Sequence, residues 1–206
     1  MKKIVKICTV VVFVIVSSAF INSKTVHGHG YKIGDVVEDF SLKNIDGKML
    51  SLADYKDSKG FILIFTCNTC PFSVAYEDRI IALNKKYASK GYPVIAINPN
   101  NPNTKPGDSF EAMQKRAKEK EFTFPYLVDK GQKVYPKFGA KKTPHNYVLQ
   151  KTKKGLVVKY IGAIDDSSRN PEAVKEKYLE NAVKALLNGK EIELKETKAI
   201  GCSIKV

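Results

Sequence analysis

The stretch that decides the fold is Phe61-Ile62-Leu63-Ile64-Phe65-Thr66-Cys67-Asn68-Thr69-Cys70-Pro71. An apolar run ends in a C-x-x-C motif, and a segment with the spacing of an amphipathic helix follows at once. This order predicts a buried strand, a pair of redox cysteines and a helix that begins at the pair. The exposed amides and the positive end of the dipole at a helix N-terminus favour a thiolate over a thiol. Because the thiolate is the form that attacks disulfides, the motif favours thiol–disulfide exchange.

Patterns of helix and strand alternate along the rest of the chain. After the motif, Phe72, Tyr76, Ile80, Leu83 and Tyr87 define one apolar face, and a glycine at position 91 provides a helix stop. The other expected elements are a hairpin that turns at Asp46-Gly47, strands at 93–97 and 126–128, a helix capped by Asp108, a short helix at 134–138, a hairpin that turns at 153–155, and a final helix that Asn170-Pro171 opens. Helices between buried strands predict one α/β domain with parallel strands, to which the late hairpin adds an antiparallel edge.

The N-terminal residues have the pattern of an export signal. A positive region precedes an apolar core, and small residues follow at the two positions that define a cleavage site. These features are Lys2, Lys3 and Lys6, then residues 7–16, then Ser17 and Ala19. We therefore expect a signal peptide at 1–19, a linker at 20–32 and one domain at 33–206, exported to a bacterial periplasm and without a transmembrane segment in the mature chain. An uncleaved membrane anchor is the alternative, because the apolar stretch can be extended to residue 21.

Charge and cysteine content narrow the function classes. Loss of residues 1–19 removes three lysines and no acid, so the formal charge falls from +14 to +11. The lysines are spread along the chain and no motif for base stacking or groove reading occurs, so we expect a solvated basic surface and no nucleic acid partner. The mature chain would keep Cys67, Cys70 and Cys202. A structural zinc site commonly uses two C-x-x-C pairs, so we expect neither a metal nor another cofactor.

A second element, Lys142-Thr143-Pro144-His145, precedes the late hairpin. A proline at the first residue of a strand is a setting in which a cis peptide bond occurs. Together with the C-x-x-C stretch, Thr143-Pro144 gives the chain a resemblance to the thioredoxin-like superfamily. Within it, the chain is similar to exported redoxins related to alkyl hydroperoxide reductase and the thiol-specific antioxidant proteins, the AhpC/TSA family. Segments 92–98, 109–113 and 201–205 support the likeness, which spans about residues 33–206.

The resemblance implies a thioredoxin-like fold, in which helices flank a central mixed sheet, with an N-terminal β-hairpin and a peroxiredoxin-type central insertion. It also implies that Pro144 is cis and lies against the cysteines, so that Thr143 and Pro144 shape a substrate groove. From its place at the strand end, we expect Cys67 to be the more exposed thiol and the nucleophile. Cys70, one turn into the helix, would resolve the mixed disulfide.

These features predict an exported thiol–disulfide oxidoreductase. Its partners would be protein thiols and disulfides, and a membrane or periplasmic electron donor.

Several residues are candidates for accessory roles. Thr66 directly precedes the pair. An imidazolium at His145 would favour the thiolate, whereas an edge-strand histidine in solvent would do nothing. Cys202 is either a thiol that packs as a small apolar group or a third redox cysteine. His27 and His29 are interpreted as part of a flexible linker rather than a metal site.

Two departures from family patterns matter. Thioredoxins have a buried carboxylate six residues before the first cysteine, where this chain has Phe61, and we expect Glu77 and Asp78 on the solvent side of the helix. Peroxiredoxins have a threonine three residues before the peroxidatic cysteine. In this chain that position is Ile64 if the cysteine is Cys67, and Cys67 if the cysteine is Cys70. The second departure counts against the alternative of a thiol peroxidase.

A further alternative is not an enzyme. Copper-delivery proteins of the same fold bind soft copper through two cysteines and a distant histidine. Cys67, Cys70 and His145 could imitate that set, although those proteins usually separate the cysteines by three residues rather than two.

Overall fold

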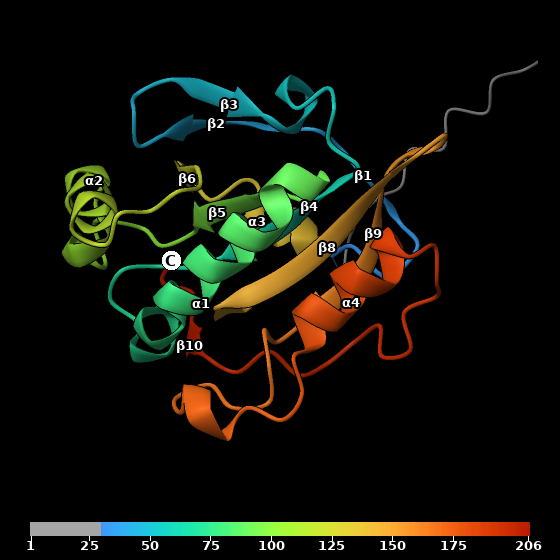
Figure 1. Ribbon diagram of the computed structural model, residues 1–206. Coiled ribbons are helices and arrows are strands. Elements are labelled where there is room, and N and C mark those ends of the chain that lie inside the picture. The colour runs from blue at the N-terminus through green and yellow to red at the C-terminus, as the bar shows by residue number, and fades with distance from the viewer. Residues whose placement is uncertain (1–29) are drawn as a thin grey trace, which may run out of the picture.

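The computed structural model describes residues 30–206, and its centre is an eight-stranded mixed sheet with the order β1-β9-β8-β4-β5-β6-β2-β3 (Figure 1). A separate two-stranded sheet joins β10 to β7. The strands are β1 Val36–Val37, β2 Ser41–Asn44, β3 Met49–Ser51, β4 Gly60–Phe65, β5 Val94–Asn98, β6 Tyr126–Val128, β7 Lys142–Thr143, β8 His145–Thr152, β9 Gly155–Gly162 and β10 Cys202–Ser203. The helices are α1 Pro71–Tyr87, α2 Phe110–Glu119, α3 Tyr135–Phe138 and α4 Tyr178–Leu187, and the short 3-10 turns are η1 Leu52–Asp54, η2 Ala88–Lys90, η3 Pro106–Asp108 and η4 Pro171–Ala173.

Strand β4 occupies the middle of the sheet. It pairs in parallel with β5 and antiparallel with β8, and every one of its residues is buried. Continuous burial requires cover on both faces, which explains why the sequence here is an unbroken apolar run. The strand therefore fixes the position of the cysteines that follow it.

Each face of the sheet has its own apolar core. Ile62 and Ile64 point to the face that α1 and α4 cover in Figure 1, and Met113 of α2 joins this cluster. Phe61 and Phe65 point to the opposite face, where α3 and the turn η1 pack. The alternation follows from the two-residue period of side chains along a strand.

The helix starts differ from the sequence patterns at two places. Helix α2 begins after Ser109, whose hydroxyl accepts a hydrogen bond from the Ala112 amide at 3.2 Å, so the predicted cap at Asp108 is wrong. Asn170-Pro171 opens only η4, and α4 starts at Tyr178. Between them the amide of Lys175 donates to the Asp166 side chain. This hydrogen bond to a residue nine positions earlier replaces the one that a continuing helix would need.

The described residues include the end of the predicted linker. The predicted signal peptide, with most of the predicted linker and both linker histidines, lies in residues 1–29, outside the described part. Tyr31 belongs to the core rather than to a linker, because it is 4% exposed and its ring lies 5.0 Å from that of Phe138. Within residues 30–206, no helix combines the length and the apolar character that crossing a bilayer requires.

Candidate active site

The two cysteines of the motif lie between the end of β4 and the start of α1. Cys67 and Cys70 are each 3% exposed, so the expectation that Cys67 is nearer the surface is wrong. Cys70 is the N-cap of α1, and Pro71 is the first helical residue, so Cys70 is not one turn into the helix either. Proline is favoured at this first position because its missing N–H has no partner in a helix anyway.

Thr143 contacts both thiols. Its hydroxyl oxygen lies 3.3 Å from the Cys67 sulfur, and its carbonyl accepts a hydrogen bond from the Cys70 thiol at 3.0 Å. The peptide bond between Thr143 and Pro144 is cis, which is what the resemblance implies. The predicted pair of cysteines and the predicted Thr-Pro element therefore meet at one place.

The two thiols differ in acidity. The hydrogen bond from Cys67 lowers the pKa of Cys70 well below its usual value, and contacts from Cys202 and the Ser73 amide act in the same direction against the effect of burial. That same hydrogen bond, with burial and the nearby charge of Asp108, raises the pKa of Cys67. A deprotonated Cys70 can no longer donate a hydrogen bond to the Thr143 carbonyl. The positive end of the helix dipole at the N-terminus of α1 stabilises the negative charge instead. Cys70 is therefore the more acidic thiol of the pair.

A buried carboxylate that the sequence did not indicate holds the loop between the cysteines. Asp108 is 1% exposed and accepts hydrogen bonds from the Asn68 amide and the Thr69 hydroxyl, both at 2.8 Å, and from the Asn100 side chain at 2.7 Å. The sequence pattern assigned Asp108 to the helix cap, although serine, the next residue, is an equally good capping type. Ser109 caps the helix, which leaves Asp108 to bind the loop.

A second buried carboxylate lies behind the pair. Glu77 is 5% exposed, which corrects its expected place on the solvent side of α1. It forms a two-pronged ion pair with Arg116 at 2.8 and 2.7 Å. Glu77 also lines a small cavity that Thr66, Cys67 and Tyr126 share. A carboxylate is thus near Cys67, although it comes from α1 and not from β4.

Cys202 also reaches the site. In β10 it stands opposite Thr143 of β7, and its side chain and backbone amide both interact with the Cys70 sulfur. The structure therefore brings together Thr66, Cys67, Cys70, Thr143 and Cys202.

His145 does not supply a positive charge to the thiols. Its Nδ1 accepts a hydrogen bond from the Lys141 amide at 3.3 Å, and burial, with the charge of Lys141, lowers its pKa to about 4. The lowered pKa favours the neutral ring, so of the two roles left open for His145 the imidazolium is not supported. Among residues 30–206, no group of three or more His, Cys, Asp or Glu side chains is placed to hold a metal ion. Cys67, Cys70 and His145 therefore do not form the copper-binding set of the alternative.

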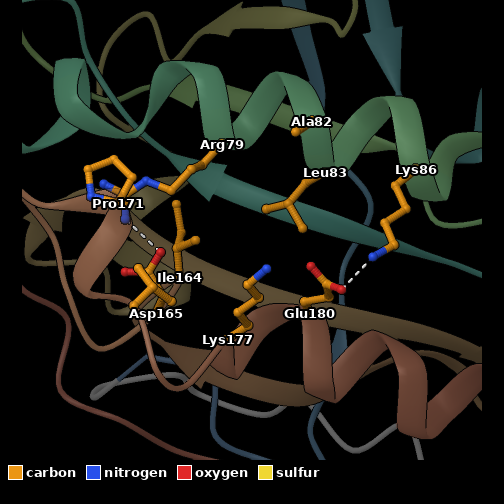
Figure 2. Close-up of a pocket in the computed structure, with 10 residues that line it drawn as sticks. Arg79, Ala82, Leu83, Lys86, Ile164, Asp165, Pro171, Lys177 and Glu180 are labelled. Carbon is orange, nitrogen blue, oxygen red and sulfur yellow. Dashed lines mark hydrogen bonds and ion pairs between the residues drawn. The ribbon is translucent and has the colours of Figure 1, made fainter.

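A separate hollow lies away from the thiols, between α1 and the chain that follows β9 (Figure 2). Its volume is about 320 Å³. Ion pairs of 2.6 Å border it, between Arg79 and Asp165 and between Lys86 and Glu180 (Figure 2). None of the predicted site residues lines it, so the chemistry of the site does not depend on it.

Comparisons with known proteins identify the family and the fold. A family model described as the AhpC/TSA family matches residues 33–163. The thiol-disulfide oxidoreductase ResA from Bacillus thuringiensis (strain Al Hakam) is 28% identical over 133 residues, which cover 63% of this chain and 69% of that relative. The crystal structure of an uncharacterized conserved protein from Geobacillus kaustophilus has a TM-score of 0.78 at 35% identity, covering 85% of this chain and 92% of that chain. The thioredoxin domain of a thiol-disulfide oxidoreductase from Bacteroides vulgatus has a TM-score of 0.52 at 14% identity, covering 63% of this chain and 88% of that chain, and shows that the fold is thioredoxin-like.

Proposed function

Because this chain belongs to the AhpC/TSA family, we propose that it is a thiol–disulfide oxidoreductase that cycles Cys67 and Cys70 between the dithiol and the disulfide. The observation that carries the proposal is that Cys67 and Cys70 both contact Thr143 at the N-terminus of α1. Two neighbouring thiols at a helix N-terminus supply one thiolate that attacks a disulfide and a second thiol that resolves the product. The activity for which ResA is named supports the same conclusion.

In the proposed reaction, the Cys70 thiolate attacks one sulfur of a protein disulfide. A bond forms between that sulfur and Cys70, the substrate S–S bond breaks, and the other substrate sulfur leaves and takes up a proton. Cys67 then loses its proton and attacks the Cys70 sulfur. The Cys67–Cys70 bond forms, the second substrate thiol leaves, and two electrons have passed from the protein to its substrate. This order reverses the one expected from sequence position. It is supported by the place of Cys70 as the N-cap of α1 and by the lowered pKa of its thiol.

Thr143 and Pro144 are proposed to shape the groove in which the substrate lies. The contacts of Thr143 with both thiols support this place for the groove. The lysine-rich start, apolar core and small residues of positions 1–19 support export, so the partners proposed are exported protein thiols and disulfides and a membrane or periplasmic electron donor.

The order of attack can be tested by trapping. A Cys67→Ser protein should accumulate mixed disulfides through Cys70, whereas a Cys70→Ser protein should accumulate none. Both variants should carry Cys202→Ser, so that the third thiol does not release the trapped species. Accumulation in the Cys70→Ser protein instead would return the role of nucleophile to Cys67.

The function itself is tested by a redox titration. The mature protein with Cys202→Ser is equilibrated with glutathione buffers, and the Cys67–Cys70 disulfide is quantified by mass spectrometry. A reversible couple near about −270 mV indicates a reductase that needs an electron supply, and one near about −120 mV indicates an oxidant of exported thiols. Absence of any reversible couple would overturn the proposal.

A further inference from the structure

The C-terminal strand β10 covers the buried pair of cysteines. Cys202 stands directly opposite Thr143 in the antiparallel pair of β10 and β7, and residues opposite one another in such a pair project to the same face. Thr143 is the residue whose hydroxyl and carbonyl contact Cys67 and Cys70. The side chain of Cys202 is therefore directed to the same thiols. Figure 1 shows the C-terminal end of the chain beside the start of α1.

The tail is held in this place by residues on both sides of Cys202. Before it, Gly201 packs so closely on Thr143 that any Cβ would overlap the Thr143 carbonyl. After it, the amide of Lys205 donates to the Asn100 side chain at 2.9 Å, and the Lys205 carbonyl accepts from the Asn101 amide and the Gln132 side chain, both at 2.8 Å. Cys202 is thus positioned by specific contacts rather than by chance.

Exposure differs among the three thiols. Cys67 and Cys70 are each 3% exposed, whereas Cys202 is only partly buried. The neighbouring Ser203 faces solvent, as expected for the next residue of a strand. With β10 in place, a protein substrate meets Cys202 before it meets the pair.

We propose that Cys202 is a third redox cysteine, which exchanges with Cys70 and carries the disulfide from the buried pair to the protein surface. The proposal rests on the proposed function of the pair and adds a catalytic residue to it.

The exchange is balanced without an external oxidant or reductant. The Cys202 thiolate attacks the Cys70 sulfur of the Cys67–Cys70 disulfide. The Cys70–Cys202 bond forms, the Cys67–Cys70 bond breaks, and Cys67 leaves as a thiolate that takes the proton lost by Cys202. An external thiolate that attacks Cys202 then forms a mixed disulfide and releases Cys70.

The decisive experiment oxidises a Cys67→Ser variant of the mature chain with glutathione disulfide and maps the products by mass spectrometry. We expect an intramolecular disulfide between Cys70 and Cys202 in most molecules. The matched control is the triple variant Cys67→Ser, Cys202→Ser, Ser203→Cys, which moves the thiol by one residue to the opposite face of β10. That control should form the intramolecular disulfide at least about tenfold less, because alternate residues of a strand face apart. Only glutathione adducts in the Cys67→Ser protein would overturn the proposal.

Turnover gives a second, independent readout. With dithiothreitol as electron donor, reduction of insulin disulfides by a Cys202→Ser protein should be about tenfold slower than by the wild type, whereas the Cys67–Cys70 couple itself persists. An unchanged rate would mean that Cys202 takes no part in exchange. Failure of the proposed function would give a different result, namely the absence of a reversible Cys67–Cys70 couple in the redox titration. The Cys70–Cys202 cross-link in the Cys67→Ser protein does not depend on that couple, so the two failures can be told apart.

Discussion

Cys70 is acidic chiefly because Cys67 donates a hydrogen bond to it. A hydrogen bond to a charged group contributes about 1.5–3 kcal/mol, which corresponds to about one to two pKa units. In a Cys202→Ser background, Cys67→Ala should therefore raise the pKa of Cys70 by about that amount relative to Cys67→Ser, whose hydroxyl still donates. Thiolate absorbance against pH measures the difference. Identical titrations of the two variants would show that helix position alone makes Cys70 acidic.

His145 should make stability depend on pH. Its pKa in the folded protein is lowered to about 4, so in mildly acidic solution the unfolded chain binds a proton that the folded chain does not. Neutral His145 contributes fully to the free energy of unfolding above its unfolded pKa of about 6.5. This contribution, at most about 3 kcal/mol, is lost as the pH falls towards 4. Urea unfolding of the wild type and of His145→Gln between pH 7.5 and about 4.5 measures it. The wild type should lose more stability than the variant, and parallel losses would contradict the assignment.

At the scale of elements, Asp108 ties the loop between the cysteines to the start of α2. Asp108→Ala leaves the Asn68 amide, the Thr69 hydroxyl and the Asn100 side chain without this acceptor. Each buried unsatisfied donor costs about 1–3 kcal/mol, so we expect a loss of several kcal/mol in the free energy of unfolding. Glu111→Ala, an exposed acid of the same segment, is the control and should change little. Equal urea midpoints for the two variants would show that the loop does not need this anchor.

Helices α1 and α2 are joined by the ion pair of Glu77 and Arg116, whose side chains are 6% and 25% exposed. Glu77→Gln removes one charge of a largely buried pair and should cost about 3 kcal/mol in unfolding free energy. The adjacent Asp78→Asn is a matched control, because that side chain is 87% exposed. Replacing both Glu77 and Arg116 by methionine should restore part of the loss. A double variant less stable than Glu77→Gln would argue against an unpaired charge as the cause.

The elements that sequence patterns predicted are those whose signals are local. The apolar run of β4, the proline at the start of α1 and the glycine turn between β2 and β3 each act within a few residues. The two-residue strands β1, β7 and β10 have no periodicity to read, and their pairing depends on distant partners. Predicted starts of helices failed where two capping residues were adjacent or where a long-range hydrogen bond competed.

At the scale of the whole molecule, the site is assembled from segments far apart in the sequence. The cysteines and the Thr143-Pro144 element were predictable because each has its own motif. Asp108 was not, because its contact with the Asn68 amide spans 40 residues and its chemistry was equally consistent with a helix cap. The place of Cys202 was also open, since only the β10–β7 pairing distinguishes a redox thiol from one that merely fills space.

The close approach of Gly201 to Thr143 has a consequence for mutational tolerance. All nineteen other residues have the same Cβ, and this atom already overlaps the Thr143 carbonyl. A saturation library at position 201 should therefore show uniform intolerance, with alanine as damaging as tryptophan. Gly47 and Gly189 make the contrast, because they have positive φ angles but open space, so asparagine should be accepted there. Sequencing the library before and after selection for disulfide exchange would measure how strictly the C-terminal strand must lie against the thiols.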